Sequence, residues 1–410
     1  LSVIDDPKTP VCIHAKTIKG YGVEKTMKSS SGGHGFPLSN PEELTAFISE
    51  IYDNKEVPEE FRNWCQDIQA KFAAKPKSAA AAPAAIPSEK IQTGIAKAMI
   101  AKKKAGLPIL SVTSDLAGST GVAGFIKEFP ESSVDVGVAE ANMVSMAVGL
   151  SKAGYIPIVD TFAQFGVTKG ALPMIMGALS EAPMIAVYSH NGFQDAADGA
   201  SHQALSYVSM TCSIPNVDVY CLTCSDEAES LMGQVLEEFY QARRLGQVPH
   251  STVFFLGREN FPKRFLNEGH SYQLRKAQVL SDNTKDFKSS VTIVAGGSLV
   301  PQALKASENL KNKNVGCIVV NPAITNRPDV ATIAACLEKT GGKIITVEDH
   351  QVIGGMGALV AHALLQSGAK VKDMKSLGVR DHFGQSAYKA SELYAKHGID
   401  AKAIEAAALA

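Results

Sequence analysis

The strongest constraint on the fold is a regular alternation of strand-like and helix-like stretches in the middle of the chain. Six short apolar runs are separated by amphipathic segments, and these runs are Ile109–Thr113, Val134–Val138, Tyr155–Val159, Met184–Ser189, Val217–Cys221 and Thr252–Leu256. Alternation of this kind predicts a doubly wound α/β domain, with a mainly parallel sheet and helices on both of its faces. Ligands of such sheets bind where the strands end, at the carboxyl edge.

Changes of composition divide the chain further. An Ala- and Pro-rich stretch predicts a linker over residues 75–88, and a charged, less periodic stretch follows the sheet. We therefore expect a strand (Pro10–Ala15) and two helices within 1–74, the doubly wound domain over 89–265, and a smaller α/β domain over 266–410. The first helix of the central domain is expected over Glu89–Lys103 with Ser88 as its N-cap. Strands of the last domain are expected at Ser290–Ala295, Val315–Val320 and Lys343–Glu348.

Charge and cysteine usage exclude several classes of protein. Forty basic residues against 41 acidic ones argue against nucleic acid or an anionic membrane as the main partner. No apolar run reaches the roughly 18 residues of a membrane span, and no signal peptide opens the chain, so we expect a cytoplasmic protein. The seven scattered cysteines form no disulfide framework. Cys221 and Cys224 have the spacing of half a zinc site, but no second pair accompanies them and the stretch Val217–Cys224 is strand-like, so they are interpreted as packed thiols.

A single carboxylate, Glu140, lies between the apolar strand Val134–Val138, which we expect to be buried, and an apolar helix that continues to Leu150. One interpretation is a glutamate in the first turn of the helix that complements the helix dipole. The other is a desolvated carboxylate presented to a ligand nitrogen at the end of a strand. Phe162 and Phe165, after the next strand, favour the second interpretation, because aromatic faces beside a carboxylate suit a planar heteroaromatic ligand.

Residues 138–150 (Val-Ala-Glu-Ala-Asn-Met-Val-Ser-Met-Ala-Val-Gly-Leu) and 161–165 (Thr-Phe-Ala-Gln-Phe) resemble the pyrimidine-binding domain of thiamine-diphosphate enzymes, transketolases in particular. The resemblance implies that Glu140 shares a proton with the aminopyrimidine of thiamine diphosphate. It also implies that Phe162 and Phe165 stack near this ring and that Asp115 binds the cofactor.

One feature departs from the family pattern. Many transketolases carry an arginine shortly after the position of Asp115, and residues 115–124 contain none. Either another residue replaces this arginine, for example Ser119 or Thr120, or the substrate differs from the usual sugar phosphates.

The loop after Met184–Ser189 holds two histidines and two aspartates, and by composition alone it reads as a solvated loop. Its likeness to the transketolase pattern implies that His190, Asp198 and His202 contact substrate, with Asp198 bonded to a sugar hydroxyl. Arg258 follows the strand Thr252–Leu256. By composition it is a surface arginine, whereas the resemblance implies that its planar guanidinium binds a substrate phosphate.

The N-terminal segment, residues 9–22 and 32–38, resembles the end of the diphosphate-binding domain of transketolases. His34 lies there in a Gly-rich loop. Composition predicts a histidine exposed in a turn, and the resemblance implies a catalytic, substrate-contacting residue. The family's Asp-Gly…Asn motif for Mg²⁺ is missing from the chain. The resemblance therefore implies that Mg²⁺ is bound mainly by a separate N-terminal portion, as in split transketolases, and that complete units dimerise.

The activity implied by the resemblance is transfer of a two-carbon ketol unit from a ketose phosphate to an aldose phosphate, with Glu140, His34 and His202 as catalytic residues. Deoxyxylulose-phosphate synthase and the β subunits of 2-oxoacid dehydrogenases share parts of the pattern. The pair His190 and His202, and the sequence His-Gly-Phe-Pro from His34, favour transketolase. A non-catalytic assembly or regulatory subunit is the alternative of another class. The C-terminal domain is expected to be mainly structural.

Overall fold

The structure is a computed structural model that describes residues 14–18, 20–28, 41–73 and 87–410. The chain divides into two compact units, Leu1–Ala84 and Ala85–Ala410, and each is described by itself. The strand predicted over Pro10–Ala15 falls mostly outside the described residues, and residues 14–18 form no regular element.

The first unit contains the two helices predicted after Pro41. Its helices are α1 (Glu24–Met27), α2 (Pro41–Ile51) and α3 (Glu59–Ala73). Both longer helices begin with two glutamates in the first turn, where carboxylates stabilise the helix dipole. They pack against each other, and the side-chain amide of Gln69 donates to the hydroxyl of Thr45 at 3.2 Å.

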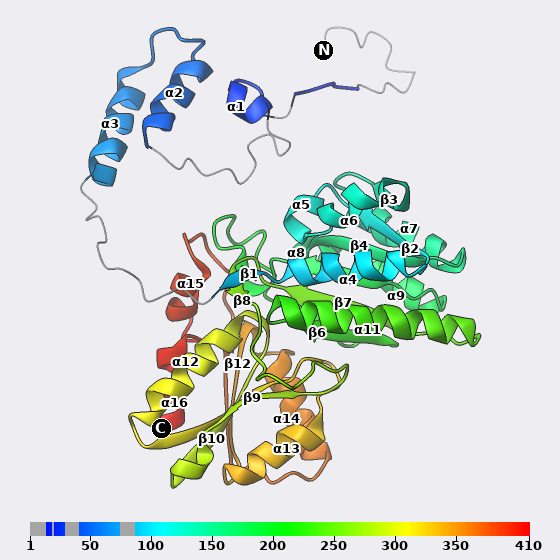
Figure 1. Ribbon diagram of the computed structural model, residues 1–410. Helices are drawn as coiled ribbons and strands as arrows, with labels where there is room; N and C mark the ends of the chain where they lie inside the picture. The colour runs from blue at the N-terminus through cyan, green and yellow to red at the C-terminus, as the bar shows by residue number, and fades with distance from the viewer. Residues whose placement is uncertain (1–13, 19, 29–40, 74–86) are drawn as a thin grey trace, which may run out of the picture. The chain divides into compact units, whose positions relative to one another are not determined.

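The second unit begins with a six-stranded sheet in which every pairing is parallel, in the order β3-β2-β4-β5-β7-β6 (Figure 1). The strands are β2 (Ile109–Thr113), β3 (Ser133–Asp135), β4 (Ile156–Phe162), β5 (Ile185–Ser189), β6 (Val217–Cys221) and β7 (Ser251–Leu256). Neighbouring residues of β4 face opposite sides, since Ile158 and Val159 belong to different core clusters. The predicted doubly wound α/β domain is confirmed.

Helices cover both faces of this sheet. They are α4 (Gln92–Lys104), α5 (Ala117–Thr120), α6 (Ala123–Glu128), α7 (Glu140–Lys152), α8 (Ala163–Lys169), α9 (Ala171–Leu179), α10 (Tyr207–Thr211) and α11 (Ser225–Arg244), with short 3₁₀ turns η1 (Pro130–Ser132) and η2 (Gly192–Gln194). Helices α4 and α11 lie side by side in Figure 1 and make the most extensive contact between any two elements. Cys221 and Cys224 are buried free thiols, as predicted.

The strand predicted over Val134–Val138 is wrong in length and in burial. β3 is only three residues long and lies at the edge of the sheet, where β2 is its single neighbour. As a result Val134 is 37% exposed and Val138, beyond the strand, is 77% exposed.

The start of the first helix of this domain also differs from the prediction. Ser88 does not cap a helix, because Ser88–Lys90 forms strand β1, which pairs antiparallel with β8 (Asn260–Pro262). Helix α4 therefore begins at Gln92, and its N-cap residue, Ile91, makes no side-chain capping bond.

The chain ends in a second, five-stranded sheet with the order β13-β12-β10-β11-β9, parallel except for the antiparallel edge strand β9. Its strands are β9 (Gln278–Asp282), β10 (Ser289–Ala295), β11 (Val315–Asn321), β12 (Lys343–Gln351) and β13 (Asp373–Val379). The helices around it are η3 (Thr284–Asp286), η4 (Gly297–Leu299), α12 (Val300–Lys311), α13 (Val330–Lys339), α14 (Met356–Gln366), α15 (Ala390–Lys396) and α16 (Ala401–Leu409). This is the smaller α/β domain predicted from the sequence.

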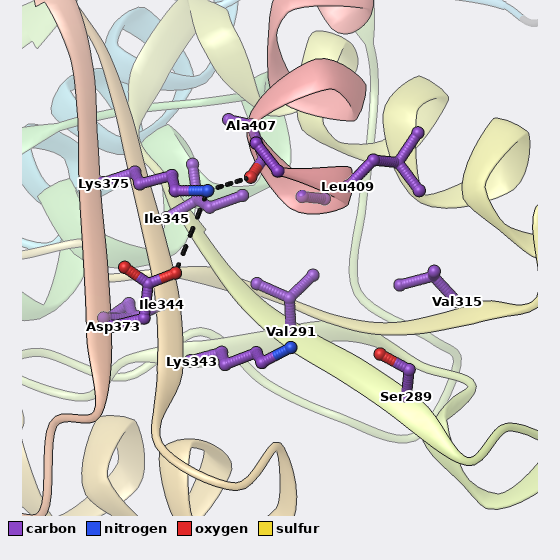
Figure 2. A pocket seen from close by; sticks show the side chains of 12 residues that line it. Ser289, Val291, Val315, Lys343, Ile344, Ile345, Asp373, Lys375, Ala407 and Leu409 are labelled. Carbon is purple, nitrogen blue, oxygen red and sulfur yellow. Dashed lines mark hydrogen bonds and ion pairs between the residues drawn. The ribbon is translucent and has the colours of Figure 1, made fainter.

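Figure 2 shows a cavity at the amino ends of the strands of the second sheet, beside the last turn of α16. The ammonium group of Lys375 crosses it, donating to the carbonyl oxygen of Ala407 at 2.8 Å and lying 3.8 Å from the Asp373 carboxylate. Parallel sheets bind their ligands at the opposite, carboxyl edge, so we assign this cavity no part in the candidate site.

The C-terminal domain covers the edge strand of the first sheet. The backbone N–H of Thr325 donates to the carbonyl of Val219 at 2.7 Å, and Cys221 donates to the carbonyl of Ala323 at 3.3 Å. The side chain of Asn326 continues this pairing, because its amide donates to the carbonyl of Val217 at 2.7 Å. Backbone N–H and C=O groups on the outer edge of β6 are therefore hydrogen-bonded by the second domain.

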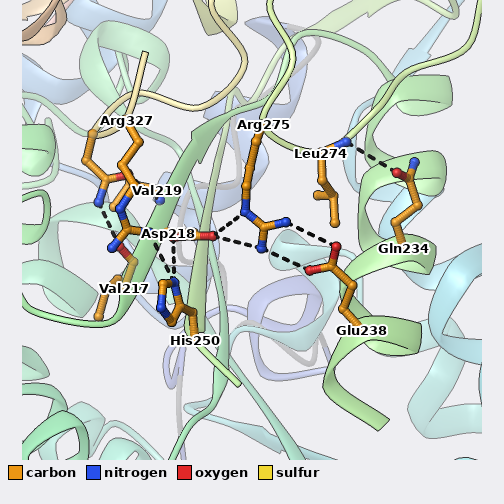
Figure 3. Close-up of polar contacts among 10 residues, drawn as sticks. Val217, Asp218, Val219, Gln234, Glu238, His250, Leu274, Arg275 and Arg327 are labelled. Atoms are coloured by element: carbon orange, nitrogen blue, oxygen red, sulfur yellow. Dashed lines mark hydrogen bonds and ion pairs between the residues drawn. The ribbon is translucent and has the colours of Figure 1, made fainter. Parts of the chain in front are cut away.

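A buried carboxylate on β6 strengthens this junction (Figure 3). The side chain of Asp218 is 2% exposed. It accepts from Nε of Arg275 at 3.2 Å, lies 3.1 Å from Nδ1 of His250, and pairs with Arg327 of the C-terminal domain. A carboxylate removed from water needs such partners, so Asp218 ties the two domains together electrostatically.

Candidate active site

The predicted site residues follow neighbouring strands of the first sheet at one edge. Glu140 follows β3, Asp115 follows β2, Phe162 ends β4, His190 follows β5 and Arg258 follows β7. These five strands are adjacent in this order. With strands about 4.8 Å apart, the row from β3 to β7 spans about 19 Å. This length suits an extended ligand, or two ligands end to end.

Glu140 is the first residue of α7 and is only 4% exposed. No side chain caps the start of this helix. Within the described residues, no hydrogen bond or ion pair ends on the Glu140 carboxylate. A buried carboxylate without a protein partner is costly, so this group is suited to receive a donor from a ligand.

The aromatic residues beside the strand ends form one cluster. The ring of His190 stacks on Phe162 with centroids 4.0 Å apart, Phe165 lies 6.4 Å from Phe162, and His202 meets Phe165 edge-on at 5.1 Å. The structure therefore brings together four of the residues singled out from the sequence. Their faces and edges offer both apolar and polar contacts to a flat ligand.

His190 is held in an unusual state. Its backbone has φ of 62°, in the left-handed region, and its side chain is 5% exposed. Burial, together with the positive charges of Arg258 and Lys90 and the nearby His202, lowers the pKa of His190 to about 3. The imidazole is therefore neutral at physiological pH. Its Nδ1 lies 2.8 Å from the hydroxyl of Ser189.

Asp115 and the segment after it lie at the end of β2. Asp115 is exposed, has φ of 63°, and its backbone N–H donates to the Asp135 carboxylate at 3.0 Å. Of the two residues proposed to replace the missing arginine, Thr120 is ruled out. It is fully buried, and its hydroxyl donates to Asp160 at 2.6 Å. Ser119 remains exposed.

Arg258 and Asp198 meet at the far end of the row. The guanidinium donates to Asp195 Oδ1 at 2.7 Å and lies 3.6 Å from the Asp198 carboxylate. Burial and the neighbouring Asp198 carboxyl raise the pKa of Asp195 to about 7, although Arg258 opposes this shift. Two carboxyls and one guanidinium therefore share this corner of the site.

Asp160 is a second buried acid beneath the strand ends. It is fully buried in β4, and its Oδ2 accepts from Thr113 at 2.9 Å and from Thr120 at 2.6 Å. Its Oδ1 has no hydrogen-bond partner among the described residues. Burial raises the pKa of Asp160 to about 7. The group ties the turn after β2 to β4, next to the site.

This pKa predicts a pH-dependent stability. Because the folded-state pKa lies above the unfolded value of 3.8, Asp160 favours the folded state at low pH, and this contribution is lost as the pH rises towards 7. Three pKa units correspond to on the order of 4 kcal/mol. We expect Asp160→Asn to be more stable than the unaltered chain at pH 8 and to lose most of this advantage at pH 5. Denaturant unfolding at both pH values measures it, with the exposed Asp286→Asn as the control; equal differences at the two pH values would contradict the assignment.

Three residues near the site were not predicted, namely Asp160, Gln194 and Asp195. Asp160 was visible in the sequence as a carboxylate inside an apolar strand, and Asp195 shares its loop with Asp198. Only the structure shows that both point inward. His34 lies outside the described residues.

No group of three or more His, Cys, Asp or Glu side chains within 14–18, 20–28, 41–73 and 87–410 is arranged to hold a metal ion. None of the helices in this part of the chain has the length and apolar character needed to cross a bilayer.

Comparison with known proteins agrees with the fold. Residues 89–262 match the family model of the transketolase pyrimidine binding domain, and residues 281–404 match that of the transketolase C-terminal domain. A putative transketolase C-terminal section from Methanocaldococcus jannaschii is 32% identical over 308 residues, which cover 74% of this chain and 90% of that protein.

Two further relatives extend the comparison. A 1-deoxy-D-xylulose-5-phosphate synthase from Haemophilus influenzae is 28% identical over 97% of this chain, which spans only 54% of that protein. A solved structure described as "Split gene transketolase, inactive beta4 tetramer" superimposes with a TM-score of 0.66 at 25% identity. The superposition covers 79% of this chain and 98% of that one. The chain therefore belongs to the transketolase family, of which it carries the pyrimidine-binding and C-terminal domains.

Proposed function

We propose that this chain is the carboxyl-terminal portion of a split transketolase, which transfers a two-carbon ketol unit from a ketose phosphate to an aldose phosphate. The observation that carries the proposal is the buried Glu140 carboxylate without a protein partner, at one end of a row of strand ends. The similarity to the archaeal transketolase C-terminal section and to the split-gene transketolase structure supports it.

Thiamine diphosphate fits the residues at the β3–β4 end of the row. Glu140 holds a proton at a ring nitrogen, Phe162 and Phe165 supply apolar faces, and Asp115 stands at the neighbouring strand end. When bound, the cofactor supplies the carbanion and the electron sink of ketol transfer. Mg²⁺ belongs mainly to the N-terminal portion in this proposal.

The sugar phosphates occupy the β5–β7 end. Neutral His190 exchanges hydrogen bonds with a substrate hydroxyl, His202 and His34 move protons, Asp198 accepts from a hydroxyl, and Arg258 binds the phosphate. The site is completed by the N-terminal diphosphate-binding portion, and complete units pair as a dimer.

Reconstitution tests this function. The chain mixed with the N-terminal portion, thiamine diphosphate and Mg²⁺ is expected to transfer ketol units between sugar phosphates, whereas the chain alone is expected to bind cofactor weakly and to show no turnover. Calorimetry that finds tight, Mg²⁺-dependent cofactor binding by the chain alone would contradict the split arrangement. Turnover of the mixture only with the substrates of 1-deoxy-D-xylulose-5-phosphate synthase would assign that activity instead. A mixture without either activity would favour a non-catalytic subunit.

A further inference from the structure

Arg258 is held at two points by consecutive residues of the loop after β5. The side-chain oxygen of Gln194 accepts from the backbone N–H groups of Arg258 at 2.9 Å and Glu259 at 2.8 Å. Asp195 Oδ1 accepts from the guanidinium at 2.7 Å. Gln194 and Asp195 are 2% and 0% exposed, whereas the Arg258 side chain is 35% exposed. The buried pair therefore fixes both ends of an arginine that stays accessible to a ligand.

The C-terminal domain supports this pair from behind. Gln194 donates to the hydroxyl of Tyr394 at 2.8 Å, and the backbone N–H of Ala387 donates to the carbonyl of Ala196 at 2.9 Å. The amide of Gln203 donates both to the carbonyl of Asp195, at 3.2 Å, and to that of Gln385 in the C-terminal domain, at 3.0 Å. The domain that we expected to be mainly structural thus braces the loop that carries Asp195.

Asp198 competes with the ligand for Arg258. Its carboxylate is already 3.6 Å from the guanidinium and is partly exposed, with 21% of its side chain accessible. If Asp195 no longer held the guanidinium, Asp198 would be the nearest acceptor. A bidentate pair between Arg258 and Asp198 would use the N–H groups that an anionic ligand needs.

We infer that Asp195 is a positioning residue, which prevents the Arg258 guanidinium from forming a close bidentate pair with Asp198 and keeps it available to an anionic group of the substrate. The inference rests on the phosphate role proposed for Arg258. It has a distinctive consequence. A purely electrostatic role predicts that removing the negative charge of Asp195 strengthens anion binding, because a like charge is gone. A positioning role predicts the opposite.

The test is the affinity of the full chain for inorganic phosphate, measured by NMR titration. Asp195→Asn keeps the shape of the side chain, and we expect it to weaken phosphate binding about tenfold, or about 1.4 kcal/mol. Asp195→Asn combined with Asp198→Asn is expected to restore the affinity to within about threefold, since no carboxylate is left to capture Arg258. Phosphate binding by Asp195→Asn that is as tight as in the unaltered chain, or tighter, overturns the inference, as does a double variant no better than the single one.

Arg258→Ala separates this inference from the function on which it rests. If Arg258→Ala binds phosphate like the unaltered chain, the phosphate role of Arg258 is wrong. If Arg258→Ala loses binding and Asp195→Asn does not, only the positioning role is wrong. A further test uses the unaltered chain and so does not depend on whether a variant folds. Hindered rotation of the Arg258 guanidinium about its Nε–Cζ bond supports the clamp, and free rotation refutes it.

Discussion

Replacement of Glu140 by Gln is expected to lower ketol transfer about 10³-fold in the chain combined with its N-terminal portion. The amide has the shape of the carboxyl group, but it neither gives up nor takes a proton at the ring nitrogen of the cofactor. Glu140 is 4% exposed and no described side chain forms a hydrogen bond or ion pair with its carboxylate, so few polar interactions within the protein are lost. Steady-state rates with saturating cofactor measure the effect.

The alternative role of Glu140, a first-turn glutamate complementing the dipole of α7, predicts a different result. It predicts a loss of about 0.3–1 kcal/mol in the free energy of unfolding and unchanged ketol transfer. Glu229→Gln is the matched control, because Glu229 is an exposed helical glutamate on α11 that is not among the candidate site residues. Full activity of Glu140→Gln would remove the basis of the proposed function.

Gly94→Ala is expected to destabilise the fold by about 3 kcal/mol. Gly94 lies in α4, where this helix packs against α11. A Cβ atom at this position would overlap the carbonyl oxygen of Ser225 and lie 2.7 Å from the backbone nitrogen of Glu229. Both are backbone atoms of α11, so relief requires the two helices to move apart. Denaturant unfolding measures the change.

Gly233→Ala is the matched control and should have the opposite sign. Gly233 also lies inside a helix, α11, and an added Cβ would meet no atom within 4 Å. Alanine should therefore stabilise the protein by about 0.5–1 kcal/mol through its helix propensity. Destabilisation of similar size in both variants would show that close packing of α4 on α11 is not the cause.

The sequence predicted the long elements well and the short ones poorly. Strands such as Ile109–Thr113 and Val217–Cys221 are buried on both faces, and their mostly apolar composition over five residues reveals them. β1 and β8 have only three residues each and carry polar side chains, so their pairing depends on tertiary contacts that no local pattern reports. β3 was placed correctly but judged to be buried, because its apolar residues conceal its position at the edge.

The same limit applies to the site. Residues at the carboxyl ends of strands were predicted because the topology of a parallel sheet brings such positions to one edge. The residues that position these site residues were not predicted. In the loop after β5, composition does not distinguish Asp195, which is buried against Arg258, from Asp198, which is partly exposed. That difference arises from the C-terminal domain, more than 180 residues later in the chain, which packs behind the loop.

Residues 323–326 hydrogen-bond to the outer edge of β6, so the solubility of the first domain depends on the presence of the second. Uncovered, β6 would present unpaired backbone groups next to apolar side chains, which is a template for pairing between molecules. A fragment ending before the second sheet would therefore be prone to aggregate, even with its own core intact. The second domain therefore protects the first from aggregation. Proteolysis between the two domains is expected to lower solubility even where the residues of the candidate site stay intact.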